Sequence, residues 1–173
     1  MLCISVEEFL FWKKKQLSKG GDQESFALLL DCIGGVSPSD LNFKSINPKE
    51  NIHLKKNLEF LESVWDDHLI KSCPIQYLCG ITFWRDLKLK VTNKVLIPRP
   101  ETELIVDIVL NIFRNKSEKL FFAELGTGSG AISIALALAY PLSKVVATDI
   151  EQDALEIANK NFINSSTEMQ SIY

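Results

Sequence analysis

Three stretches in the first 80 residues repeat their apolar positions at the spacing of an α-helix. Asp22 precedes the second stretch as an N-cap, Gly34 and Gly35 end it, and Pro74 stops the third. We therefore predict a small helical bundle over residues 1–80. Its helices are expected over residues 6–17, 22–33 and 54–69, with a short helical turn opening at Ser37-Pro38.

The apolar period changes to two between residues 81 and 97. Leu87, Leu89 and Val91 alternate with polar residues, and Arg85-Asp86 is expected to form a turn after "ITFW". The pattern predicts a β-hairpin that links two parts of the chain.

Helix and strand patterns alternate from residue 98 to residue 173. A helical pattern from Glu101 leads to a buried strand, "LFFAEL", which a glycine-rich loop and an apolar helix ending at Ala139 follow. A second strand, "KVVATD", precedes a second helix over residues 152–164. Strands and helices that alternate at these lengths predict an α/β domain with a parallel sheet.

Composition limits the classes of protein that the chain can belong to. It has 173 residues, 46% of them hydrophobic, and a net charge of −3, without the basic excess of a nucleic-acid-binding protein. The longest apolar run, residues 131–140, is too short to cross a bilayer, and the N-terminus does not resemble a secretory signal. Four cysteines lack the spacing of a metal site. We expect a cytoplasmic protein with no metal, no membrane association and no direct nucleic-acid partner; the oligomeric state stays open.

The stretch "ELGTGSGAISIALALA" lies between the first strand and its helix. Gly126, Gly128 and Gly130 allow tight turns and close approach of a ligand to free backbone N–H groups. Asp149 ends the next strand, 23 residues after Gly126, where its carboxylate would accept both hydroxyl protons of a ribose. Together these residues predict a site for an adenosine-type ligand, although helix–strand packing alone also selects small residues.

Two cofactors fit such a loop. Gly126, Gly128 and Ala131 satisfy the G-x-G-x-x-G/A pattern of dinucleotide sites, so an NAD-dependent oxidoreductase is one alternative. Glu124, however, would then lie close to a pyrophosphate dianion. S-adenosylmethionine has a sulfonium and an ammonium group and no phosphate, so Glu124 can face its positive end. We predict S-adenosylmethionine.

Three segments resemble the HemK/PrmC family of protein-(glutamine-N5) methyltransferases, which modify peptide chain release factors. They are "VLIPRPETELIVD", "ELGTGSGAISIALA" and "ATDIEQDALEIANKN", and "PIQYLCGITFWRDLKLKVT" is similar to the hairpin linker of that family. The resemblance implies a Rossmann-like class I S-adenosylmethionine-dependent methyltransferase domain that follows an N-terminal helical bundle and a β-hairpin. It implies transfer of a methyl group to the glutamine of the release factor's GGQ motif.

The resemblance also implies roles for individual residues. Asp149 would bind the ribose, and the cofactor loop would consist of Gly126, Thr127, Gly128, Ser129 and Gly130. A substrate-side loop near the mouth of the active site would contain Arg99, Pro100, Glu101 and Thr102. Alternatively, Arg99 and Glu101 form an ion pair at a helix start, with Pro100 in its first turn.

The family's Asn-Pro-Pro-Tyr motif, which holds the poorly nucleophilic amide in line with the methyl group, does not occur in the 173 residues. We therefore expect an incomplete methyltransferase domain without catalytic residues, and an inactive chain. The chain would be a truncated product, a retained fragment, or one part of a complex that a second polypeptide completes. The alternative to an enzyme is a noncatalytic module that binds a partner protein.

Overall fold

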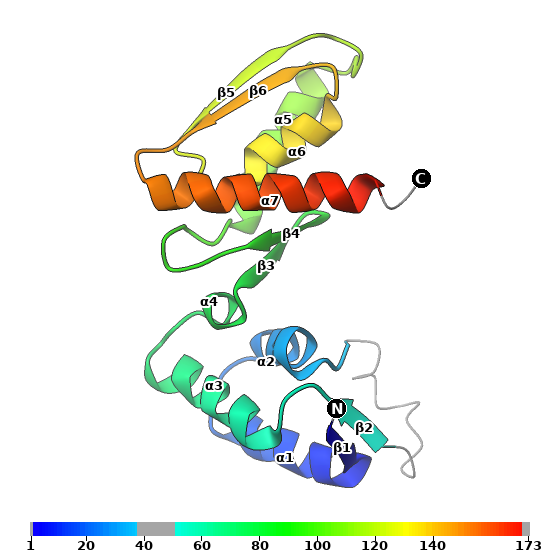
Figure 1. The fold of residues 1–173 in the computed structure, drawn as a ribbon, viewed down its shortest axis with the longest axis vertical. Coiled ribbons are helices and arrows are strands. Elements are labelled where there is room, and N and C mark those ends of the chain that lie inside the picture. Colours follow the sequence, from blue (N-terminus) through cyan, green and yellow to red (C-terminus); the bar gives the residue numbers. More distant parts are fainter. Residues whose placement is uncertain (1, 38–50, 171–173) are drawn as a thin grey trace. The chain divides into compact units, whose positions relative to one another are not determined.

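The computed structural model describes residues 2–37 and 51–170, with side chains described as far as Ser165. The chain divides into two compact units, Met1–Cys79 and Gly80–Tyr173 (Figure 1). The predicted turn at Ser37-Pro38 falls in part on residue 38, outside the described residues.

The first unit is mainly helical, as the apolar spacing predicted. The side chains of Ser5, Asp22 and Asn57 each accept a hydrogen bond from a backbone N–H three residues further on, so local sequence defines three of its helix starts. Gly35, with φ of 73°, ends the second helical segment in a left-handed conformation. The helical elements are α1 (Val6–Ser18), α2 (Gln23–Leu29), the π-helical turn η1 (Leu30–Gly34), α3 (Leu58–Ile70) and α4 (Ile75–Cys79).

The prediction of a helix from residue 54 was wrong at its start. Leu54 ends strand β2 (Asn51–Leu54), which pairs antiparallel with β1 (Leu2–Ser5). Leu54 shares the helical stripe of α3 in the sequence, but the helix begins only after its N-cap Asn57. Apolar spacing does not reveal this strand pair, because its two partners lie about fifty residues apart in the chain.

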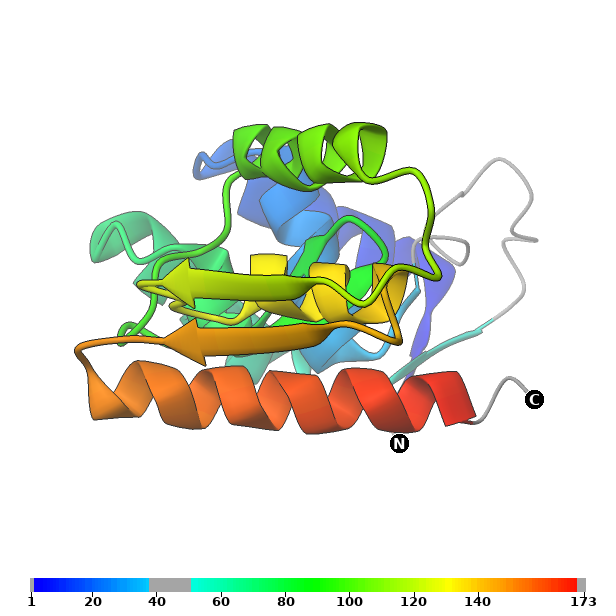
Figure 2. The same ribbon diagram turned by 90° about the horizontal axis from the view of Figure 1, so that it is seen from above.

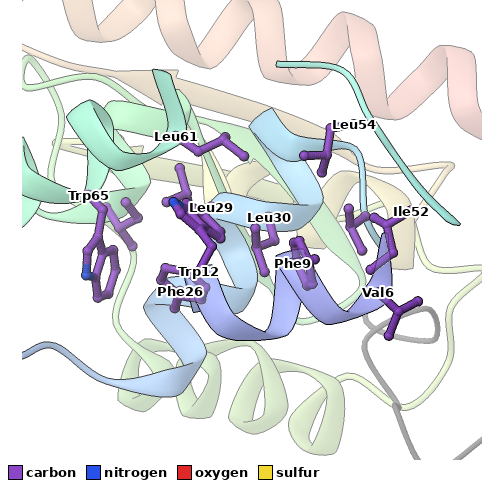
Figure 3. Close-up of a cluster of buried hydrophobic side chains, with 12 residues drawn as sticks. Val6, Phe9, Trp12, Phe26, Leu29, Leu30, Ile52, Leu54, Leu61 and Trp65 are labelled. Atoms are coloured by element: carbon purple, nitrogen blue, oxygen red, sulfur yellow. The ribbon is translucent and has the colours of Figure 1, made fainter. Parts of the chain in front are cut away.

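Four aromatic side chains lie among aliphatic ones in the core of the first unit, as Figure 3 shows. Phe9 lies 5.9 Å from Trp12 and Trp12 lies 5.6 Å from Phe26, measured between ring centroids. Phe26 meets the edge of Trp65 at 4.9 Å. The core thus joins α1, α2 and α3 through large side chains that each remove a wide apolar area from water.

We expect Asp22→Ala to lower the free energy of unfolding of the first unit by about 1 kcal/mol, because α2 loses its N-cap. The Asp22 carboxylate accepts from the backbone N–H of Ser25 at 2.7 Å and from its hydroxyl at 2.8 Å. These bonds lower the pKa of Asp22 below its usual value. The stabilisation is therefore present above the unfolded-state pKa and is lost as the pH falls through the lower folded-state pKa.

Urea unfolding of the chain and of Asp22→Ala, measured at neutral pH and at decreasing pH, checks this expectation. Asp22→Asn is the control, since it keeps an acceptor for the Ser25 N–H but no charge. A stability difference that is absent at neutral pH, or that stays constant into acid, would contradict the capping role.

The second unit begins with the predicted hairpin. Strands β3 (Ile81–Trp84) and β4 (Leu87–Lys90) pair antiparallel, and Arg85 adopts a φ of 50° in the turn between them. The predicted alternation of helices and strands is confirmed in the rest of the unit. It consists of the 3-10 turn η2 (Pro100–Thr102), α5 (Glu103–Ile112), β5 (Phe121–Leu125), α6 (Ala131–Ala139), β6 (Lys144–Thr148) and α7 (Gln152–Gln170).

Strands β5 and β6 are parallel, with Phe121 opposite Lys144. Helix α6 contacts both strands and also packs against α5 and α7, and Figure 2 shows it behind the strand pair. The side chains of Phe121 and Leu125 are 65% and 84% exposed, so the described residues leave the other face of β5 uncovered.

Helix α7 is longer than predicted, ending at Gln170 in place of residue 164. Its additional residues, "SSTEMQ", include no glycine or proline that would stop a helix. Within the described parts of the chain, none of the helices has the length and apolar character required to span a bilayer.

Candidate functional site

The glycine-rich loop joins the end of β5 to the start of α6. Gly126, Gly128 and Gly130 have φ values of 74°, 56° and 83°, which residues with a side chain rarely adopt. The backbone N–H groups of Gly126 and Thr127 both donate to the carbonyl of Thr148, at 2.8 and 2.9 Å. The loop is thereby fixed to the carboxyl end of β6, the edge at which parallel α/β sheets bind ligands.

The three glycines have different surroundings. A Cβ atom added at Gly126 or Gly128 would meet no other atom within 4 Å. A Cβ atom at Gly130 would lie 3.1 Å from the Cβ of Ala158 and 3.2 Å from its Cα. The first two glycines therefore leave open space beside the loop, whereas Gly130 allows α7 to approach the backbone closely.

Asp149 follows β6 directly, and its carboxylate faces the loop. One oxygen accepts from the N–H of Gly128 at 2.8 Å, and the other accepts from the N–H of Glu151 at 3.1 Å. The N–H groups of Glu151 and Gly128 lower the pKa of Asp149, so the group is a carboxylate at neutral pH. A carboxylate has about four acceptor positions, so these two bonds leave acceptor capacity on both oxygens.

Glu124 lies in β5, and its carboxylate is hydrogen-bonded to the glycine loop and to α6. Its Oε2 accepts from the hydroxyl of Thr127 at 2.7 Å, from the backbone N–H of Ser133 at 3.1 Å and from the Ser133 hydroxyl. These bonds connect β5 to the loop and to the first turn of α6, where a negative charge is favourable. The sequence predicted that Glu124 faces a ligand. In the structure its carboxylate also binds Thr127 and Ser133 of the protein itself.

A pocket of about 320 Å³ lies beside the loop and brings most of the predicted residues together. Its walls include Glu124, Asp149, Thr102 and residues 126–129 of the loop. Gly130 lies behind this wall, in contact with α7.

The predicted substrate-side loop is only partly at this pocket. Thr102 lines it, whereas Arg99, Pro100 and Glu101 are exposed and do not. The alternative ion pair is not formed, since no salt bridge joins Arg99 to Glu101 among the described residues. Pro100 does open the 3-10 turn, and the Arg99 carbonyl accepts from the indole N–H of Trp84 at 3.0 Å.

Sequence reasoning gave no role to one segment that also lines the pocket. Lys94, Val95, Leu96 and Pro98 follow β4 and form part of the pocket wall. Lys94 forms an ion pair with Asp153 at 3.0 Å, which raises the pKa of the lysine. These residues lie outside any regular element and have no apolar period, and the signal for them in the sequence was the segment "VLIPRPETELIVD", which contains Val95, Leu96 and Pro98.

The described residues contain no group of three His, Cys, Asp or Glu side chains that could hold a metal ion. The pocket combines backbone N–H groups, three acidic side chains and apolar side chains, an arrangement typical of sites for organic ligands.

Comparisons with known proteins agree with this geometry. A family model described as "methyltransferase small domain" matches residues 103–173. A release factor glutamine methyltransferase of Prochlorococcus marinus is 42% identical over 170 residues, which are 98% of this chain and 58% of the relative. Proteins of the same name from Synechocystis sp. and Streptococcus pneumoniae are 36% and 32% identical over 91% and 93% of the chain.

The fold, the loop and these matches define a Rossmann-like class I methyltransferase domain, of which the chain contains the first part. The chain belongs to the HemK/PrmC family of release factor glutamine methyltransferases. It spans about half the length of these relatives, from 55% to 58% of each.

Proposed function

We propose that the protein binds S-adenosylmethionine in the pocket beside the glycine loop and transfers its methyl group to a side-chain amide nitrogen. The acceptor is the glutamine of the GGQ motif in peptide chain release factors, and the reaction takes place in the cytosol. One observation supports the proposal most directly: two carboxylates, Glu124 and Asp149, line the same pocket as the open backbone of Gly126 and Gly128.

The residues of the pocket fit this cofactor. Open space at Gly126 and Gly128 lets a planar base or ribose lie against the loop, and Asp149 has acceptor capacity left for ribose hydroxyls. Glu124 contributes negative charge for the cationic end. When bound, S-adenosylmethionine supplies an electrophilic methyl group on its sulfonium.

A dinucleotide fits the same pocket less well. Its pyrophosphate would add negative charge to a pocket that already contains Glu124, Asp149 and Glu151. Among the described residues that line the pocket, Lys94 is the one cation, and it already pairs with Asp153.

The described residues position the cofactor and do not include the group that orients the amide. An amide nitrogen donates its lone pair to the carbonyl, so transfer depends on alignment with the methyl group. Arg99, Pro100, Glu101 and Thr102 are proposed to contact the protein substrate, with Thr102 closest to the pocket. The residue that aligns the amide is assigned to the Asn-Pro-Pro-Tyr motif, which these 173 residues do not contain.

Calorimetric titration of the 173-residue chain with S-adenosylhomocysteine, S-adenosylmethionine and NAD tests the cofactor. We expect heat of binding from the first two compounds and none from NAD. Binding of NAD alone would overturn the proposal in favour of an oxidoreductase, and no binding of any of them would favour the noncatalytic module.

A chimera tests the reaction. Residues 1–173 are joined to the segment that follows the aligned region in the Prochlorococcus marinus relative, and radiolabelled S-adenosylmethionine is supplied with a release factor. We expect label on the GGQ glutamine from the chimera and none from the 173 residues alone. A release factor with Gln→Ala in that motif is the control, and label on this variant would contradict the proposed acceptor.

A further inference from the structure

Asn161 on α7 is completely buried, and its side chain makes three hydrogen bonds to elements other than its own helix. A buried amide without partners is costly, and this one uses both of its donors and an acceptor. Such a side chain links the backbones that it contacts.

Two of the three bonds go to β4. The backbone N–H of Lys90 donates to Oδ1 of Asn161 at 2.7 Å, and Nδ2 donates back to the carbonyl of Lys90 at 3.0 Å. The amide thus binds the last residue of β4 as the peptide group of an adjacent strand would. Four residues later, the chain that leaves β4 reaches the pocket at Lys94.

The third bond goes to the glycine loop. Nδ2 of Asn161 also donates to the carbonyl of Ser129 at 2.8 Å. Ser129 is 3% exposed and lines the pocket, and the next residue, Gly130, lies against Ala158 on the same side of α7. Helix α7 therefore holds the loop at two adjacent residues.

The pocket has one wall from each of these segments. Residues 94–96 and 98 form the wall that follows β4, and residues 126–129 form the wall of the loop. Asn161 is hydrogen-bonded to the backbone of Ser129 in the loop and to that of Lys90, the last residue of β4, four residues before the other wall begins. We propose that Asn161 is a positioning residue that sets the distance between the two walls of the cofactor pocket; this inference rests on the proposed function.

Asparagine fits this position because two donors must face two carbonyls while one acceptor faces an N–H. In Asn161→Asp the acceptor for Lys90 remains, but carboxylate oxygens face the carbonyls of Lys90 and Ser129. In Asn161→Leu all three bonds are lost at similar volume. When these hydrogen bonds are lost, the two walls of the pocket are no longer held at a fixed distance, even where the fold persists.

The experiment compares the 173-residue chain with Asn161→Leu, with the isosteric variant Asn161→Asp, and with the matched control Ser165→Ala. Ser165 lies one turn further along α7 and is buried, and its hydroxyl donates to the backbone carbonyl of Asn161. Calorimetry with S-adenosylhomocysteine at a temperature where all variants are folded is expected to show about tenfold weaker binding for both Asn161 variants and an unchanged constant for Ser165→Ala.

Amide hydrogen exchange without ligand supplies a second readout. We expect faster exchange at Gly128–Gly130 and at residues 94–96 in the Asn161 variants, and wild-type rates there in Ser165→Ala. If the unaltered chain does not bind S-adenosylhomocysteine, the proposed function fails, while the exchange rates still decide the role of Asn161. Lower stability with an unchanged binding constant and unchanged exchange at both walls would overturn the inference.

Discussion

Replacing Asp149 with alanine is expected to weaken binding of S-adenosylhomocysteine roughly 30- to 150-fold. The carboxylate lines the pocket and is held in place by the N–H groups of Gly128 and Glu151. A ribose with two hydroxyls would donate to its remaining acceptor positions, and both bonds are charge-assisted. The alanine variant removes these bonds and also leaves the two backbone N–H groups without their acceptor.

Asp149→Asn removes the charge of the side chain but keeps its size and one acceptor oxygen. We expect a loss intermediate between the wild type and Asp149→Ala. Because the pKa of Asp149 is lowered, the affinity of the wild type should stay constant from neutral into mildly acidic solution and fall only through that lowered pKa. Unchanged dissociation constants in both variants would assign Asp149 to the structure of the turn alone.

Replacing Gly130 with alanine is expected to lower the stability of the second unit by about 3 kcal/mol. Two costs add: a left-handed backbone conformation for a residue with a Cβ costs about 1–2 kcal/mol, and overpacking costs about 1–3 kcal/mol. The added Cβ would lie 3.1 Å from the Cβ of Ala158 and 3.2 Å from its Cα. Because the Cα belongs to the backbone of α7, a change of side-chain rotamer cannot relieve this contact. Separation of α7 from the loop would relieve the contact.

Gly128→Ala is the matched variant, because Gly128 has a similar positive φ and open space where the Cβ would lie. It should cost only the backbone strain, about 1–2 kcal/mol, while its methyl group enters the pocket and weakens cofactor binding. Urea unfolding followed by circular dichroism measures both variants, and the transition of the first unit serves as an internal reference. Equal losses of stability in Gly128→Ala and Gly130→Ala would contradict the close packing of Gly130 on α7.

Local sequence determined the helices and the order of the elements in this protein. Capping residues and apolar spacing act over three or four positions, so α1, α2 and α5 could be predicted closely from the printed residues. The glycine loop and Asp149 were also predictable, because the end of one parallel strand lies beside the end of the next. The family resemblance came from the same short segments.

Contacts between distant segments were decided only by the tertiary structure. Strands β1 and β2 pair across about fifty residues, and Asn161 bonds Lys90 and Ser129 across 71 and 32 residues. No local pattern encodes such partners, because they depend on how helices and strands pack. The same packing makes two glycines of one alternating run different. Gly128 faces the open space of the pocket, whereas Gly130 is covered by α7.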